Sequence, residues 1–167
     1  MASLLPLSGN LGKRLAKHLL RRATYNISKA RIEEFSNYTV SQAMAKLLDF
    51  PAKKLTQPIH YDTGSPWIND DPIYGPVDNT HDSGQIKLNN YLAGWWMDEA
   101  KRDTSLRAKM TYFLFTDFTT SIRTLNNEFH YDYLMLLEFF CVGDWKEFVY
   151  QMTKNNVMLK YLNNNEN

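Results

Sequence analysis

The sequence predicts an all-α protein, because three features agree. Apolar residues recur at intervals of three and four along most of the chain, which is the spacing of one helix face. Residues that cap helices precede several of these segments, and no two segments alternate apolar and polar residues as paired strands do. With 44% hydrophobic and 14% aromatic residues, the helices have enough apolar surface to bury a core rich in rings.

The first predicted helix covers residues 10–23. Leu11, Leu15, His18 and Leu19 lie at helical spacing and predict its apolar face. Lys13, Arg14, Lys17 and Arg21 lie on the other faces of the helix.

The charge of the chain is unevenly distributed, although its net value is only +1. Residues 1–32 contain seven Lys and Arg and no acid, whereas residues 33–167 contain the other 12 of the 19 basic residues and all 18 acids. The net charge gives no overall attraction to nucleic acid, which is not an expected partner. Two interpretations of the basic start remain open: it packs on the acidic remainder of the fold, or it faces a membrane or an acidic partner.

Two short helices follow. Ser28 is a suitable cap for a helix over residues 28–35, and Thr39 for a helix through Leu48. Pro51 ends the second of these helices.

A long loop is predicted over residues 51–85, which hold five of the six prolines and many Asp and Asn. No period of 2 or 3.6 persists there, and a loop of this length is usually functional or mobile. Trp67 and Tyr74 are candidates for stacking on a carbohydrate, or they attach the loop to the helical body.

Five further helices are predicted in the second half of the chain. Asp103 or Thr104 caps the second of them, Gly143 ends the third, and Asp144 caps the fourth. The expected spans are about 85–99, 104–121, 127–141, 145–152 and 157–162.

Three stretches in order resemble one bacterial family, the "domain of unknown function 1800". Residues 18–25 read HLLRRATY and are similar to its opening signature, H-L-L-R-R-A-T-F. Residues 109–121 read KMTYFLFTDFTTS and resemble its K-M-T-x-F-W-H-N-H-F-x-T-S. Residues 143–167, with Gly-Asp-Trp and Met-Leu-Lys-Tyr-Leu, resemble its G-N-F and M-L-x-Y-L-D-N-x-x-N.

The resemblance has consequences for function. Leu114, Phe115 and Asp117 stand where the family has a tryptophan and two histidines, so any metal or proton-transfer role of those histidines is absent here. The family continues with a P-N-E-N-x-A-R-E segment, which implies that residues 1–167 form one helical domain at the N-terminal end of a larger protein. It also implies a sulfatase-like partner protein and, in many members, export, but no established reaction.

The candidate site residues are few. His18 is a core histidine or a polar site residue, and Arg21 and Arg22 form structural ion pairs or bind an anion. Asp117 keeps one oxygen ligand in the second motif. No H-E-x-x-H, paired C-x-x-C or phosphate-loop pattern is present, so neither a metal nor a cofactor is predicted.

The predicted function is that of an uncharacterised helical module of a larger bacterial protein, contacting a partner or its own C-terminal part. Two alternatives remain: a hydrolase-like enzyme whose site the C-terminal segment completes, and a carbohydrate-binding surface. No apolar stretch is long enough to span a bilayer, and the residues do not define a compartment.

Overall fold

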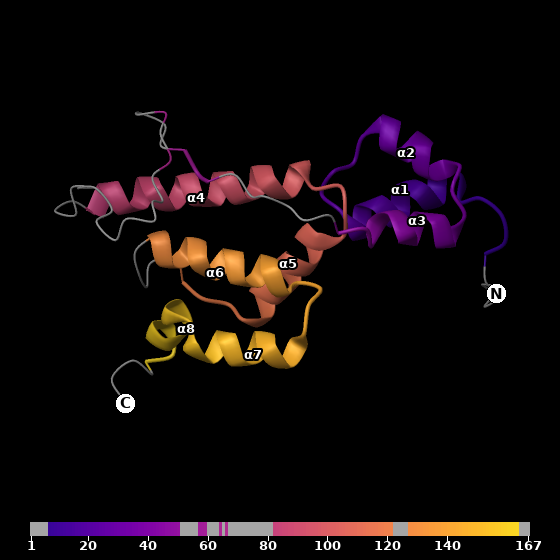
Figure 1. Cartoon of the computed structure of the whole chain (residues 1–167). Coiled ribbons are helices and arrows are strands. Elements are labelled where there is room, and N and C mark those ends of the chain that lie inside the picture. The colour runs from indigo at the N-terminus through magenta and orange to yellow at the C-terminus, as the bar shows by residue number, and fades with distance from the viewer. Residues whose placement is uncertain are drawn as a thin grey trace, which may run out of the picture. The chain divides into compact units, whose positions relative to one another are not determined.

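The computed structural model of the chain describes residues 7–50, 57–59, 64, 66, 82–121 and 127–163, with residues 82–88 and 127–128 described by their backbone alone. Regular secondary structure in these residues is entirely helical (Figure 1). The two recorded β-bridges, Asn10 with Thr39 and Ile59 with Pro66, are isolated. The all-α prediction is therefore confirmed.

The helices agree closely with the predicted spans. They are α1 (Gly12–Ala23), α2 (Lys29–Ser36), α3 (Val40–Leu47), α4 (Asp82–Arg102), α5 (Arg107–Asp117), α6 (Asn127–Phe140), α7 (Trp145–Lys154) and α8 (Asn156–Tyr161).

Two predicted boundaries were wrong. The loop over residues 51–85 ends earlier, because α4 begins at Asp82, in polar residues that apolar periodicity cannot detect. Most of residues 51–81 lie outside the part of the chain that the structure describes. The helix expected to reach Ser121 ends instead at Asp117, where the Phe118 amide makes the last bond of the ladder, to the Leu114 carbonyl (2.8 Å).

The chain divides into two compact units, which we describe separately. Unit 1 comprises Met1–Lys53 with Ala100–Lys109, and unit 2 comprises Lys54–Glu99 with Met110–Asn167.

The core of unit 1 lies among α1, α2 and α3. Leu20, Phe35, Ala43 and Leu47 are almost completely buried there. Leu106, from the second segment of the unit, packs on this cluster, and its amide donates to the Leu47 carbonyl (2.9 Å). Burial of these apolar groups is the main stabilising term of the unit.

Both predicted caps in unit 1 are present. The Ser28 hydroxyl accepts from the amide of Arg31 at the start of α2. Thr39 forms a capping box with Gln42 at the start of α3.

Unit 2 is organised around α6, which lies between α4 and α7 (Figure 1). Tyr133 and Leu137 on α6 are fully buried at its centre, together with Phe148 from α7 and Val157 from α8. The Asp144 carboxylate caps α7 by accepting from the Glu147 amide (2.8 Å), as predicted. The single cysteine, Cys141, is a buried thiol of this core.

Removing the Asp103 side chain should destabilise the start of α5. Its Oδ1 accepts from the Ser105 amide (3.0 Å) and hydroxyl (2.8 Å), and its Oδ2 accepts from the Ala108 amide (2.8 Å). Loss of such a cap costs about 1–2 kcal/mol. We therefore expect Asp103→Ala to lower the free energy of unfolding by about this amount in urea titrations. Asp49→Ala, at an exposed carboxylate, is the control; equal losses would contradict the capping role.

Candidate functional site

The histidine and arginines singled out on α1 are all exposed. His18, Arg21 and Arg22 face away from the buried side of the helix, which is formed by Ala16, Leu20 and Ala23. The interpretation of His18 as a core histidine was therefore wrong. Ala16 and Ala23 form part of the buried face, because their small side chains allow neighbouring elements to approach α1 closely. Apolar periodicity based on large aliphatic residues does not identify these two positions.

These residues belong to a wider basic face. Arg14, Lys17 and Arg21 lie within about 60° of one another around the axis at 100° per residue, and all three are exposed. His18 and Arg22 extend the face on one side, and α1 contains no acidic residue. We call the surface of Arg14, Lys17, His18, Arg21 and Arg22 the basic face.

The cations of this face are not neutralised within the part of the chain that is described. Lys13, at its edge, pairs with Glu33 on α2 (2.8 Å), and both side chains are largely exposed. No side chain of the basic face makes an ion pair or hydrogen bond with a described residue. Within unit 1, the interpretation that the helix packs on acidic parts of the fold is therefore supported at Lys13.

The other predicted site residues lie elsewhere. Asp117 is exposed at the end of α5 and belongs to unit 2, whereas the basic face belongs to unit 1. Trp67 and Tyr74 lie outside the described residues. The basic face is therefore described without Asp117, Trp67 and Tyr74, whose predicted roles stay predictions.

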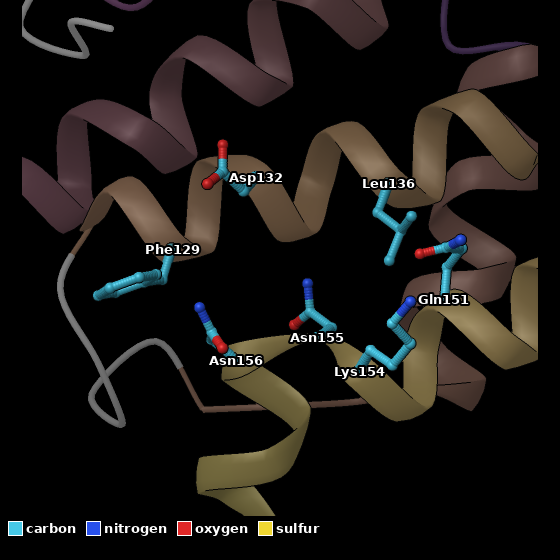
Figure 2. Close-up of a pocket in the computed structure, with 7 residues that line it drawn as sticks. All are labelled: Phe129, Asp132, Leu136, Gln151, Lys154, Asn155 and Asn156. Atoms are coloured by element: carbon cyan, nitrogen blue, oxygen red, sulfur yellow. The ribbon is translucent and has the colours of Figure 1, made fainter. Parts of the chain in front are cut away.

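A second candidate is a polar hollow of about 310 Å³ in unit 2, between α6 and the junction of α7 with α8 (Figure 2). Its lining combines an acid, a lysine, three amides and two apolar side chains: Asp132, Lys154, Gln151, Asn155, Asn156, Phe129 and Leu136. Sequence analysis did not find it, because the residues come from three helices and form no motif.

Several polar groups of this hollow already stabilise their own helices. Asn155 Oδ1 accepts from the amides of Val157 (3.0 Å) and Met158 (3.3 Å) and so caps α8. The Gln151 amide donates to Glu147 Oε1 (2.6 Å), and Lys154 Nζ lies 4.6 Å from the centroid of the Tyr150 ring. The hollow is therefore a weaker candidate than the basic face, whose cations have no such role.

Two tyrosines of unit 2 have raised pKa values because they are packed in its core. Burial raises the pKa of Tyr133, whose hydroxyl donates to the Phe118 carbonyl. Burial, with the nearby carboxylates of Asp132 and Glu99, raises the pKa of Tyr131, whose ring lies 5.3 Å from that of Trp95. Both phenols are therefore neutral at physiological pH and act as packed rings.

Neither a metal centre nor a membrane span is found in the described residues. No group of three or more His, Cys, Asp or Glu side chains lies close enough to hold an ion there. In the same part of the chain, no helix is both long and apolar enough to cross a bilayer.

Comparison with known proteins agrees with the three motifs. Residues 18–167 match the family described as "Protein of unknown function (DUF1800)". No curated protein and no solved structure matches the chain. The matched span begins at His18, so it includes three of the five residues of the basic face and all of α2 to α8. On this match, the chain belongs to the DUF1800 family.

Proposed function

We propose that the chain is a non-catalytic interaction module whose basic face binds an acidic segment of a partner protein. The observation that supports this most directly is the set of exposed cations on α1, which have no acidic partner among the described residues. Unpaired cations on one face create a local positive potential that attracts and orients an anionic partner.

The geometry of α1 favours an acidic polypeptide over a membrane. A helix that lies on a bilayer inserts its apolar face between the lipids. The apolar side of α1, with Ala16, Leu20 and Ala23, is instead buried in the core of unit 1. Only the charged side is exposed for contact, so binding would be electrostatic without insertion.

Nucleic acid is a weaker match for the same face. Proteins that hold single strands combine cations with aromatic side chains on which bases stack. The basic face has no aromatic member, and Tyr25, beyond the end of α1, lies under Lys109, whose Nζ is 3.7 Å from its ring centroid. Spacing supports a peptide: Arg14, Lys17 and Arg21 recur at three and four residues, which matches carboxylates on one side of an acidic helix.

The proposal is tested with a labelled polyglutamate peptide, titrated into the whole chain and followed by fluorescence anisotropy. An exposed ion pair contributes about 0.5 kcal/mol, so the triple variant Arg14→Gln, Lys17→Gln, Arg21→Gln should bind about tenfold more weakly. The control removes the same charge at three other exposed lysines, Lys101→Gln, Lys146→Gln and Lys160→Gln, and should change affinity less than about twofold.

Further ligands make the test selective. Binding to polyglutamate should weaken as salt is raised, because the contacts are exposed. A purified sulfatase-like protein, the partner implied by the family resemblance, is titrated in parallel and should show the same order of variants. An equal loss of polyglutamate affinity in both triple variants would overturn the proposal. Tight binding to duplex DNA or anionic vesicles, with no binding to polyglutamate, would overturn it as well.

A further inference from the structure

An apolar hollow of about 230 Å³ lies within unit 2, among residues of α4, α5 and α6. Its walls are largely aromatic: the ring centroids of Trp96 and Phe115 are 5.1 Å apart, and those of Phe115 and Tyr133 are 6.3 Å apart. Leu92 and Leu134 complete the apolar walls. Ala93, which also lines the hollow, is exposed, so the hollow reaches the surface beside α4.

One polar atom in this lining lacks a partner. Thr120 Oγ1 is buried and makes no hydrogen bond with any residue that the structure describes. Two neighbouring polar groups of the lining already have hydrogen-bond partners. The Tyr133 hydroxyl donates to the Phe118 carbonyl, and His130 Nε2 donates to the Ser121 carbonyl (2.9 Å). A buried hydroxyl without a partner is unfavourable, and a ligand that supplies one gains that interaction.

We propose that this hollow binds a small, uncharged aromatic molecule that carries one hydroxyl group, with its ring against the aromatic walls and its hydroxyl on Thr120 Oγ1. The size suits a single substituted ring, since an apolar cavity of about 150 Å³ accommodates benzene. The described residues of the lining include no acid, lysine or arginine, so they offer a charged ligand no compensation for its desolvation. An apolar pocket with one or two directed polar groups is the usual form of a small-molecule site.

The test compares phenol with toluene, two rings of similar size that differ in the hydroxyl. Affinities are measured on the whole chain by calorimetry, and methyl NMR shifts of Leu92 and Leu134 report whether the ligand occupies the hollow. Thr120→Val keeps the side-chain shape and removes the hydroxyl, so the ratio of phenol to toluene affinity should fall about fivefold. Toluene itself should bind the Val variant at least as well.

A second variant tests occupancy independently of the hydrogen bond. Ala93→Leu extends a side chain at the mouth of the hollow and should weaken both ligands about tenfold or more. Shifts confined to Leu92 and Leu134, with Val157 unchanged, would support the site. No binding of either ligand, an unchanged affinity ratio in Thr120→Val, or full binding in Ala93→Leu would overturn it.

Discussion

Replacing Phe148 with alanine is expected to lower the free energy of unfolding of unit 2 by about 3–5 kcal/mol, which is a large part of the stability of a typical domain. Phe148 is fully buried. Its ring lies 4.9 Å from that of Phe118 in an edge-to-face arrangement, 5.8 Å from that of Phe140 and 5.4 Å from that of Trp145. The alanine leaves a cavity and removes three ring contacts at once.

Urea denaturation followed by circular dichroism measures this loss, and Tyr150→Ala is the matched control. Tyr150 is an aromatic residue of the same helix, but its side chain is 55% exposed. Its removal should cost less than about 1 kcal/mol, since little area returns to water. A smaller loss for Phe148→Ala than for Tyr150→Ala would show that α7 does not dock through this ring.

Arg31→Met is expected to destabilise unit 1 by about 2–3 kcal/mol. The guanidinium of Arg31 donates to the carbonyls of Asn26 (2.6 Å) and Thr104 (2.7 Å), and it lies 5.3 Å from the centroid of the Phe35 ring. Hydrogen bonds from a charged donor contribute about 1.5–3 kcal/mol each, and partial exposure of this group lowers the expected sum for the two bonds to about 2–3 kcal/mol. Methionine keeps the apolar stem and leaves both carbonyls without this donor.

The Arg31 bonds connect residues that are 73 positions apart in sequence, so their loss should also have a local effect. The amide of Leu106, which donates to the Leu47 carbonyl, should exchange with solvent faster in Arg31→Met. Lys29→Met, at an exposed cation of the same helix, should change neither stability nor exchange appreciably. Unchanged exchange at Leu106 in Arg31→Met would contradict the role of Arg31 as a link within unit 1.

Burial lowers the pKa of Arg31, whereas the nearby carboxylates of Glu34 and Asp103 raise it. The guanidinium remains charged because an arginine pKa lies far above physiological pH. Arg31 is therefore part of the fold. By charge alone it resembles the other cations of residues 1–32, but its position on α2 and its bonds to Asn26 and Thr104 distinguish it from the basic face.

The sequence predicts which residue types contribute to the candidate site, but it does not predict how they are arranged in space. Arg21 and Arg22 were identified by charge, and their exposure follows from the burial of Ala16 and Leu20 on the opposite side of α1. The orphan hydroxyl of Thr120 was not predictable, because an isolated threonine carries no signal of what surrounds it. The polar hollow at Asn155 and Asn156 was missed for the same reason.

The helical class, most helix boundaries, the caps at Ser28, Thr39 and Asp144, and the family motifs could all be predicted from the amino-acid sequence. These features depend on residues within a few positions of one another, so periodicity and local hydrogen bonding are sufficient to predict them. Three outcomes needed the packed fold: His18 is exposed, Asp103 caps α5 in preference to Thr104, and Arg31 bonds to residue 104. Those outcomes depend on which side of each helix meets the core, and residues distant in sequence determine that.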